Sequence, residues 1–120
     1  MKTIRILMLV MLAASFTTLT AQKKVDPVGT WSYEAEYAPY EYSSGDIVVS
    51  KEGKEYQVEL KLGEYYKIKA SNVEYKDNVL SFKVYVEGES VSVKTTMKKD
   101  SHAGTASYSE GTLELNGKKK

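Results

Sequence analysis

Hydrophobic and polar residues alternate along most of this chain, and that period of two constrains its fold more than any other feature. Leu80, Phe82 and Val84 are each separated by one residue, and the intervening positions carry Ser and Lys. Similar runs cover residues 55–62 and 90–98. Successive side chains of a β-strand point to opposite faces of its sheet, so each run predicts a strand with one buried and one solvated face.

Turn residues divide these runs into eight predicted strands. The connections contain Gly, Pro, Asn or Asp, which favour tight turns. The predicted strands cover residues 28–38, 46–51, 55–62, 65–70, 79–87, 90–98, 103–109 and 112–116. Val73 and Tyr75 are predicted to continue the fourth strand beyond a bend at Ser71 and Asn72. Short strands with hairpin-length turns predict an all-β fold, an eight-stranded antiparallel up-and-down meander barrel, with a sandwich as the alternative.

Residues 1–21 have the three parts of a secretory signal peptide. Lys2 and Arg5 supply a basic start, an apolar run follows, and Ala21 is a small residue at the expected cleavage point. The apolar run is shorter than the about 20 residues that a membrane span needs. We therefore expect export through a cleaved signal peptide to the periplasm or the external medium. Residues 22–120 would then form a single barrel domain.

The composition of residues 22–120 excludes several kinds of chemistry. Cleavage removes two of the 17 basic residues and none of the 16 acidic ones, which leaves a net charge of −1 and no long-range attraction to nucleic acid. The predicted domain has no Arg, no Cys and one His, so bidentate anion clamps, thiolate chemistry and multi-His metal sites are missing. With no disulfide to stabilise so small a domain, a closed barrel is favoured because closure removes edge strands.

Two groups of residues invite an enzymatic interpretation, and the sequence argues against both. His102 follows Asp100 and Ser101, but adjacent residues cannot converge as a catalytic triad, and this His is predicted to lie exposed in a turn. Glu34 and Glu36 share one face of the first strand, as a pair of catalytic carboxylates could. That face is predicted to be solvated, so neither carboxyl would have the raised pKa that a general acid needs. We therefore predict a protein that is not an enzyme, with no catalytic residue, cofactor or metal ion.

Gly29, Thr30 and Trp31 open the first predicted strand soon after the signal peptide. A Gly-x-Trp at this position, followed by an all-β meander, resembles the lipocalin and fatty-acid-binding group of barrels, in particular the small secreted lipocalin-like domains of Gram-negative bacteria. The resemblance implies that Trp31 plugs the closed end of the barrel and that the interior holds a small ligand. The Arg that packs on this Trp in the group is missing here, which leaves Lys118 as a candidate substitute.

The leading functional prediction is an exported, non-enzymatic binding module that holds a small apolar or amphipathic molecule inside the barrel. The predicted lining consists of inward-facing aromatic and aliphatic side chains: Trp31, Tyr33, Tyr56, Val58, Tyr66, Ile68, Phe82, Val84 and Met97. The alternative is that the tyrosines among them belong to a packed core and that their hydroxyls reach the barrel ends.

The second prediction places the function on the loop around Pro39. Tyr37, Tyr40 and Tyr42 gather there, and an exposed aromatic loop is suited to binding an envelope protein or a glycan while the barrel serves as a packed scaffold. The same three rings would instead cover the barrel mouth if they pack on it. Residues 118–120, all lysine, are predicted to be a solvated, frayed tail.

Overall fold

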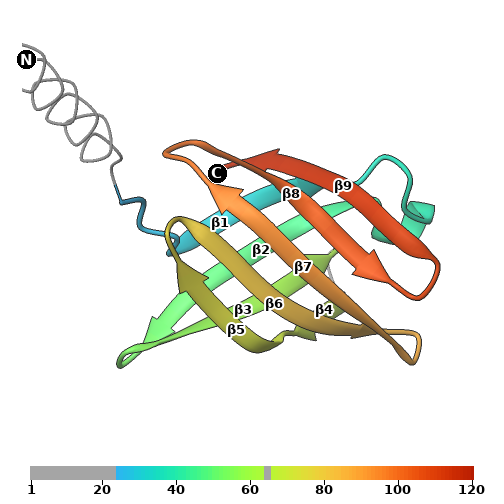
Figure 1. Ribbon diagram of the computed structural model, residues 1–120, viewed down its shortest axis with the longest axis horizontal. Helices are drawn as coiled ribbons and strands as arrows, with labels where there is room; N and C mark the ends of the chain where they lie inside the picture. The colour runs from blue at the N-terminus through green and yellow to red at the C-terminus, as the bar shows by residue number, and fades with distance from the viewer. Residues whose placement is uncertain (1–23, 64–65) are drawn as a thin grey trace, which may run out of the picture.

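Nine antiparallel strands form one curved sheet in the computed structural model, which describes residues 24–63 and 66–120 (Figure 1). The predicted signal peptide, residues 1–21, lies outside the described residues. The strands are β1 (Gly29–Glu34), β2 (Ser44–Glu52), β3 (Glu55–Leu62), β4 (Tyr66–Lys69), β5 (Ser71–Lys76), β6 (Val79–Val86), β7 (Glu89–Met97), β8 (Ser101–Tyr108) and β9 (Gly111–Lys118). A single turn of 3-10 helix, η1 (Tyr40–Tyr42), follows β1. Within this part of the chain no helix is both long and apolar enough to cross a membrane.

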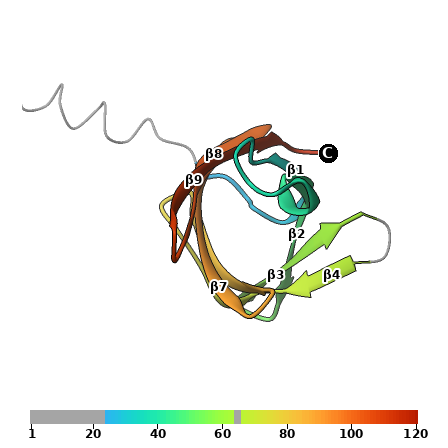
Figure 2. The same cartoon turned by 90° about the vertical axis from the view of Figure 1, so that its right-hand side faces the viewer.

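The sheet is a meander that curls until its first and last strands meet. Its strand order is β4-β3-β2-β1-β9-β8-β7-β6-β5, and every neighbouring pair is antiparallel. Viewed at right angles to Figure 1, the strands surround a central space (Figure 2). The all-β antiparallel prediction is therefore confirmed, as a nearly closed barrel whose sheet ends at β4 and β5.

The count of eight strands was wrong because the fourth predicted strand changes partner halfway. Its first half, β4, pairs with β3, whereas its second half, β5, pairs with β6. The bend predicted at Ser71 and Asn72 is present: Asn72 has a left-handed φ of 52°, and the β5–β6 register shifts between Ser71 and Glu74. Because Asn is one of the few residues that tolerate this conformation, the sequence can bend there. The bend divides the strand and leaves the barrel incompletely closed beside β4.

The boundaries of two predicted strands in particular also differ from the structure. β1 ends at Glu34 rather than at residue 38. The chain turns between residues 35 and 38, where the Ala38 N–H donates a hydrogen bond to the Ala35 carbonyl at 3.0 Å. β8 begins at Ser101 rather than at residue 103, since the Lys98 N–H donates to the Ser101 carbonyl at 2.7 Å and shortens the turn. That shift carries His102 from the predicted exposed turn into a strand.

The inner face of the sheet forms one hydrophobic core, as the alternation predicts. On β6 and β7 the buried positions follow the expected period of two. The most completely buried of the large side chains include Trp31, Ile47, Leu80 and Met97. Trp31 is fully buried, and its indole Nε1 donates to the Pro27 carbonyl at 2.9 Å, so the segment before β1 covers this end of the barrel.

Strands β1 and β9 close the barrel through an irregular contact. Regular pairing is confined to Glu34 with Asn116, and a bridge joins Trp31 to Lys119. Between these points the Lys118 N–H donates to the Ser32 hydroxyl at 3.0 Å instead of to a backbone carbonyl. Gly117 is required here, because a Cβ on it would lie 1.8 Å from the Ser32 carbonyl oxygen.

The C-terminal lysines are ordered by this closure, so the prediction of a frayed tail was wrong. Lys119, and not Lys118, lies over the Trp31 ring, with its Nζ 5.5 Å from the ring centroid. Adjacent residues of a strand face opposite ways, so a register error of one residue explains the wrong choice of lysine. Lys120 donates from its backbone N–H to Thr30 at 2.9 Å and forms an ion pair with Asp46 at 3.1 Å.

We expect Gly117→Ala to destabilise the barrel, because its methyl group would force β1 and β9 apart. Overpacking of this kind costs about 1–3 kcal/mol in the free energy of unfolding, which urea denaturation measures. Asn116→Ala, at an exposed position of the same strand, is the control and should change the stability by less than about 0.5 kcal/mol. Equal stabilities of the two variants would contradict this account of the closure.

Candidate functional site

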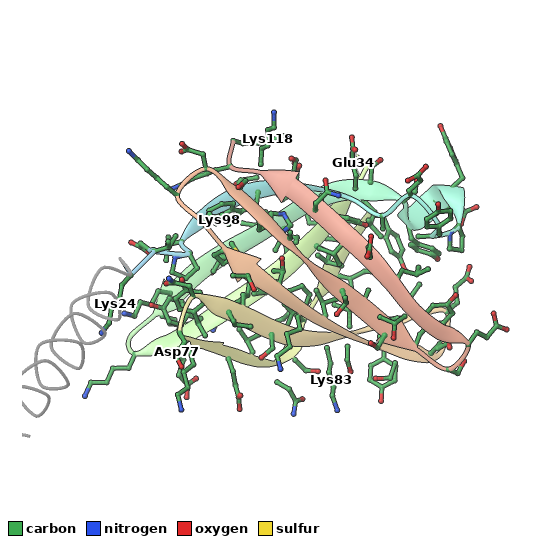
Figure 3. All side chains as sticks on the ribbon, turned by 45° about the horizontal axis from the view of Figure 1, so that its top comes forward. Lys24, Glu34, Asp77, Lys83, Lys98 and Lys118 are labelled. Atoms are coloured by element: carbon green, nitrogen blue, oxygen red, sulfur yellow. The ribbon has the colours of Figure 1, made fainter. Side chains whose placement is uncertain are left out.

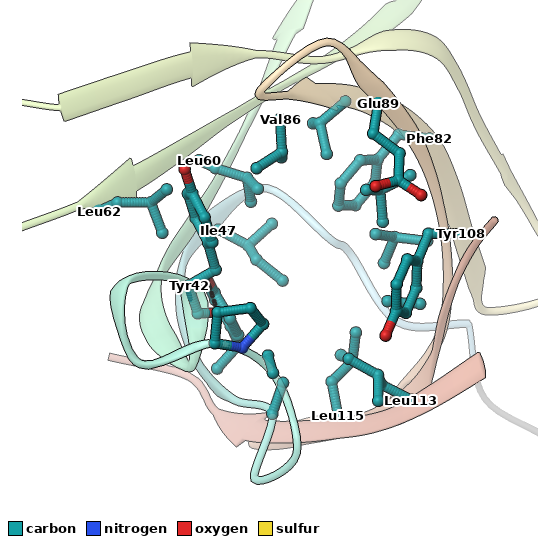
Figure 4. Close-up of a pocket in the computed structure, with 18 of the residues that line it drawn as sticks. Tyr42, Ile47, Leu60, Leu62, Phe82, Val86, Glu89, Tyr108, Leu113 and Leu115 are labelled. Atoms are coloured by element: carbon teal, nitrogen blue, oxygen red, sulfur yellow. Dashed lines mark hydrogen bonds between the residues drawn. The ribbon is translucent and has the colours of Figure 1, made fainter. Parts of the chain in front are cut away.

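A cavity of about 230 Å³ lies inside the barrel, at the end opposite Trp31 (Figure 4). Its wall is mainly apolar and comes from seven strands and the loop after β1. The apolar lining residues are Ala35, Ala38, Pro39, Ile47, Leu60, Leu62, Phe82, Val84, Val86, Val91, Val93, Ala106, Leu113 and Leu115. The volume is below the about 300–1,000 Å³ of pockets for drug-sized ligands, so the space suits a short alkyl chain or a small ring system.

Side-chain size explains why the barrel is filled at one end and hollow at the other. Trp31, Met97 and His102 occupy the closed end. Towards the open end, β8 presents Gly104 and Ala106 on its inner face, where the alternation predicts small side chains. Gly104 is required by close backbone packing, since a Cβ on it would lie 2.0 Å from the Lys94 carbonyl oxygen. Ala106 lines the cavity and leaves it room.

Three of the predicted lining residues surround this cavity: Tyr33, Phe82 and Val84. All three are buried, and they come from β1 and β6. Tyr33 lies at the boundary between core and cavity, and its hydroxyl donates to the Tyr42 carbonyl at 2.9 Å. Burial raises the pKa of Tyr33 to about 12, so this hydroxyl stays a hydrogen-bond donor at neutral pH.

The other predicted lining residues lie elsewhere. The buried side chains Trp31, Val58, Ile68 and Met97 belong to the packed core and do not line the cavity. Tyr66 lies on β4 beside the incomplete closure of the sheet, and 52% of it is exposed.

Tyr56 is also outside the cavity lining. Its ring packs edge-on against Tyr75, with 5.5 Å between the centroids, where β3 approaches β5. This contact joins the two halves of the sheet on the side where their hydrogen bonding is interrupted. The core role that the sequence left open for these tyrosines therefore describes Tyr56 better than a place in the lining.

Sequence reasoning missed the wall formed by β8 and β9. Tyr108, Leu113 and Leu115 line the cavity, together with Glu89 at the start of β7. The alternation of residues 102, 104, 106 and 108 carried a signal for Tyr108, since they share one face of a strand. The predicted strand of residues 103–109 already placed residues 104, 106 and 108 on one face, but Tyr108 was not included in the predicted lining.

The polar groups of the site lie at its rim. Burial, and then a hydrogen bond to the Glu87 carboxylate, raises the pKa of Tyr42 above its usual value. Glu89 accepts a hydrogen bond from the Ser109 N–H at 2.9 Å and another from the Ser109 hydroxyl. Glu89 and Tyr108 lie on the same side of the cavity, across from Tyr42 (Figure 4).

The three loop tyrosines do not form one surface. Tyr37 and Tyr40 are 76% and 93% exposed, whereas Tyr42 is half-buried and lines the cavity. Tyr42 therefore packs on the barrel mouth, as one alternative expected, and the rings of Tyr37 and Tyr40 face solvent.

His102 is buried at the closed end, and its prediction as an exposed turn residue was wrong. Its Nε2 is 2.7 Å from the Ser32 carbonyl oxygen, which can only accept, so this nitrogen carries the proton. Nδ1 of the neutral ring then accepts from the Thr95 hydroxyl at 2.8 Å. Burial lowers the pKa of His102 below its ordinary value, and the hydrogen bond to Ser32 only partly offsets this. His102 does not line the cavity.

The acidic residues offer no metal centre in the described part of the chain, where no group of three or more His, Cys, Asp or Glu side chains is placed to hold an ion. Comparison with protein-family models, with curated proteins and with solved structures finds no match to this chain.

The burial of His102 predicts a stability that depends on pH. Because its pKa is lower in the folded than in the unfolded chain, unfolding takes up a proton and acid favours it. The free energy of unfolding should therefore fall as the pH is lowered from about 7 to about 5. This decline should be absent from His102→Gln.

The His102 ring signal in the proton NMR spectrum provides an independent measurement on the unchanged protein. It is readily assigned, because the sequence contains one His. We expect this signal to titrate with a midpoint below the ordinary 6.5. A midpoint at or above that value would contradict the buried, neutral imidazole.

Proposed function

We propose that this protein is an exported, non-enzymatic binding module that holds a small apolar or amphipathic molecule in the cavity at the open end of its barrel. The observation that carries the proposal is the cavity itself, about 230 Å³ of mainly apolar space inside an otherwise packed core. Unfilled apolar volume costs stability, and apolar cavities of about 150 Å³ in other proteins take up small apolar molecules.

A lipocalin-like assignment belongs to the same proposal. Its support is the Gly-x-Trp at the start of β1: Gly29 has a φ of 141°, which glycine adopts readily, and Trp31 is fully buried beneath Lys119. Export rests on the predicted signal peptide of residues 1–21.

Binding is best tested with N-phenyl-1-naphthylamine, a neutral apolar fluorophore that accepts energy from tryptophan. We expect saturable one-to-one binding with energy transfer from Trp31, the single Trp of the chain. Ala106→Phe should weaken the binding at least about tenfold, because the added ring would occupy the cavity.

Ala103→Phe is the matched control. Residue 103 lies on the same strand, but its side chain is exposed on the outer face of the barrel, so binding should be unchanged. The absence of saturable binding to folded protein, or equal binding by the two variants, would overturn the proposed site.

A second candidate function has its own observation, the exposure of Tyr37 and Tyr40 on the loop between β1 and β2. Two solvated aromatic rings beside the barrel mouth offer a surface for a sugar face or an envelope protein. This candidate uses the barrel as a scaffold and does not require an occupied cavity.

Replacing both Tyr37 and Tyr40 by Ser should abolish binding of the protein to an oligosaccharide array. The melting temperature should stay within about 2 °C of the original. Tyr85→Ser removes another exposed ring, 67% exposed on β6, and should have no effect on the array. Equal array binding by the unchanged chain and the double variant would remove this candidate for glycans.

A further inference from the structure

We propose that the cavity selects amphipathic molecules with a cationic, amine-type head group and discriminates against carboxylates. This inference rests on the proposed binding function and adds to it the chemical class of the ligand. It follows from the polar groups at the rim of the cavity and from the acidic residues in the loops around the open end.

The rim offers negative charge and hydroxyl groups. Glu87 lies in the β6–β7 turn, Glu89 begins β7, and both line the cavity, as do Tyr42 and Tyr108. Among the described lining residues none is a Lys, an Arg or a His. A ligand that places its apolar part among the aliphatic side chains therefore brings its head group to two carboxylates.

These groups suit an ammonium head. Carboxylate oxygens accept charge-assisted hydrogen bonds from N–H donors, which are shorter and stronger than neutral ones. The rings of Tyr42 and Tyr108 can add cation–π attraction. Glu89 is fixed in place by the two hydrogen bonds from Ser109, so its acceptor position is set before a ligand arrives. A carboxylate head would meet like charges and would lose hydration without gaining a cationic partner.

The charges of the surrounding loops act in the same direction. At the open end, the connections of residues 35–43, 87–88 and 109–110 contain Glu and no basic residue. At the closed end, Lys119 lies over the Trp31 ring, and the turn of residues 98–100 carries two Lys and one Asp. Figure 3 shows Glu34 towards the open end, and Lys24, Lys98 and Asp77 towards the opposite one. The acidic residues of the loops at the open end therefore attract cations to the mouth and repel anions from it.

The test compares three ligands that share one alkyl chain: decylamine, 1-decanol and decanoate. Each displaces N-phenyl-1-naphthylamine from the unchanged protein at about pH 7, below the concentration at which it forms micelles. We expect decylamine to bind at least about tenfold more tightly than decanoate, with decanol between them. Added salt should weaken the binding of decylamine and leave that of decanol unchanged.

A double variant, Glu87→Gln with Glu89→Gln, identifies the groups responsible. Gln keeps the size and the hydrogen-bond acceptor of Glu, so the contact with Ser109 can persist. The variant should lose most of the preference for decylamine over decanoate and should bind decanol as before, which also shows that it is folded. Glu114→Gln, exposed on β9, makes a charge change away from the cavity and should keep most of the preference.

The outcomes separate this inference from the function on which it rests. If decylamine and decanoate bind equally, the selection of head groups is wrong. If the double variant keeps the preference, the assignment of that selection to Glu87 and Glu89 is wrong. The binding function stands in both cases. If the fluorophore and decanol both fail to bind the folded protein, the binding function itself is wrong, and this inference fails with it.

Discussion

The architecture depends on the closure of β1 against β9, and that closure depends on a buried, neutral imidazole. His102 donates to the Ser32 carbonyl at 2.7 Å, where the hydrogen bonding between the two strands is irregular, and Gly117 leaves the space for this contact. A backbone carbonyl without a partner in the core would cost stability, so the ring replaces a missing ladder hydrogen bond. The same ring packs edge-on against Trp31, with 6.0 Å between the centroids, and the two fill the closed end.

The cavity follows from the way this closed end is filled. The bulky side chains Trp31, Met97 and His102 lie at one end, and small residues on β8 and in the loop after β1 leave room at the other. One end of the barrel is thus filled by packed side chains, and the other has apolar space beneath an acidic rim. That difference between the two ends fits the proposed function, in which the packed end would serve as scaffold, the cavity would bind the apolar part of a ligand, and the rim carboxylates would select its head group.

Much of this fold could be predicted from alternation and turn chemistry alone. The alternation of Leu80, Phe82 and Val84 determines which face is buried, and Asn72 marks the bend. The site was harder to predict than the fold. Alternation shows which side chains face inward, but it does not show where those side chains leave space between them. His102 was misplaced because Ser and Asp before it suggested a longer turn, and only the pairing of β7 with β8 shows that it lies in a strand.

The central claim is that an apolar ligand enters the open end of the barrel and stops above the closed end. The most direct measurement is a methyl NMR titration of the protein with 1-decanol. We predict saturable shifts of the Val93, Leu113 and Leu115 methyl signals, which line the cavity, and little change at Val49 and Val58, which are buried outside it. An unchanged spectrum, or shifts confined to exposed methyl groups such as those of Val28, would contradict the account.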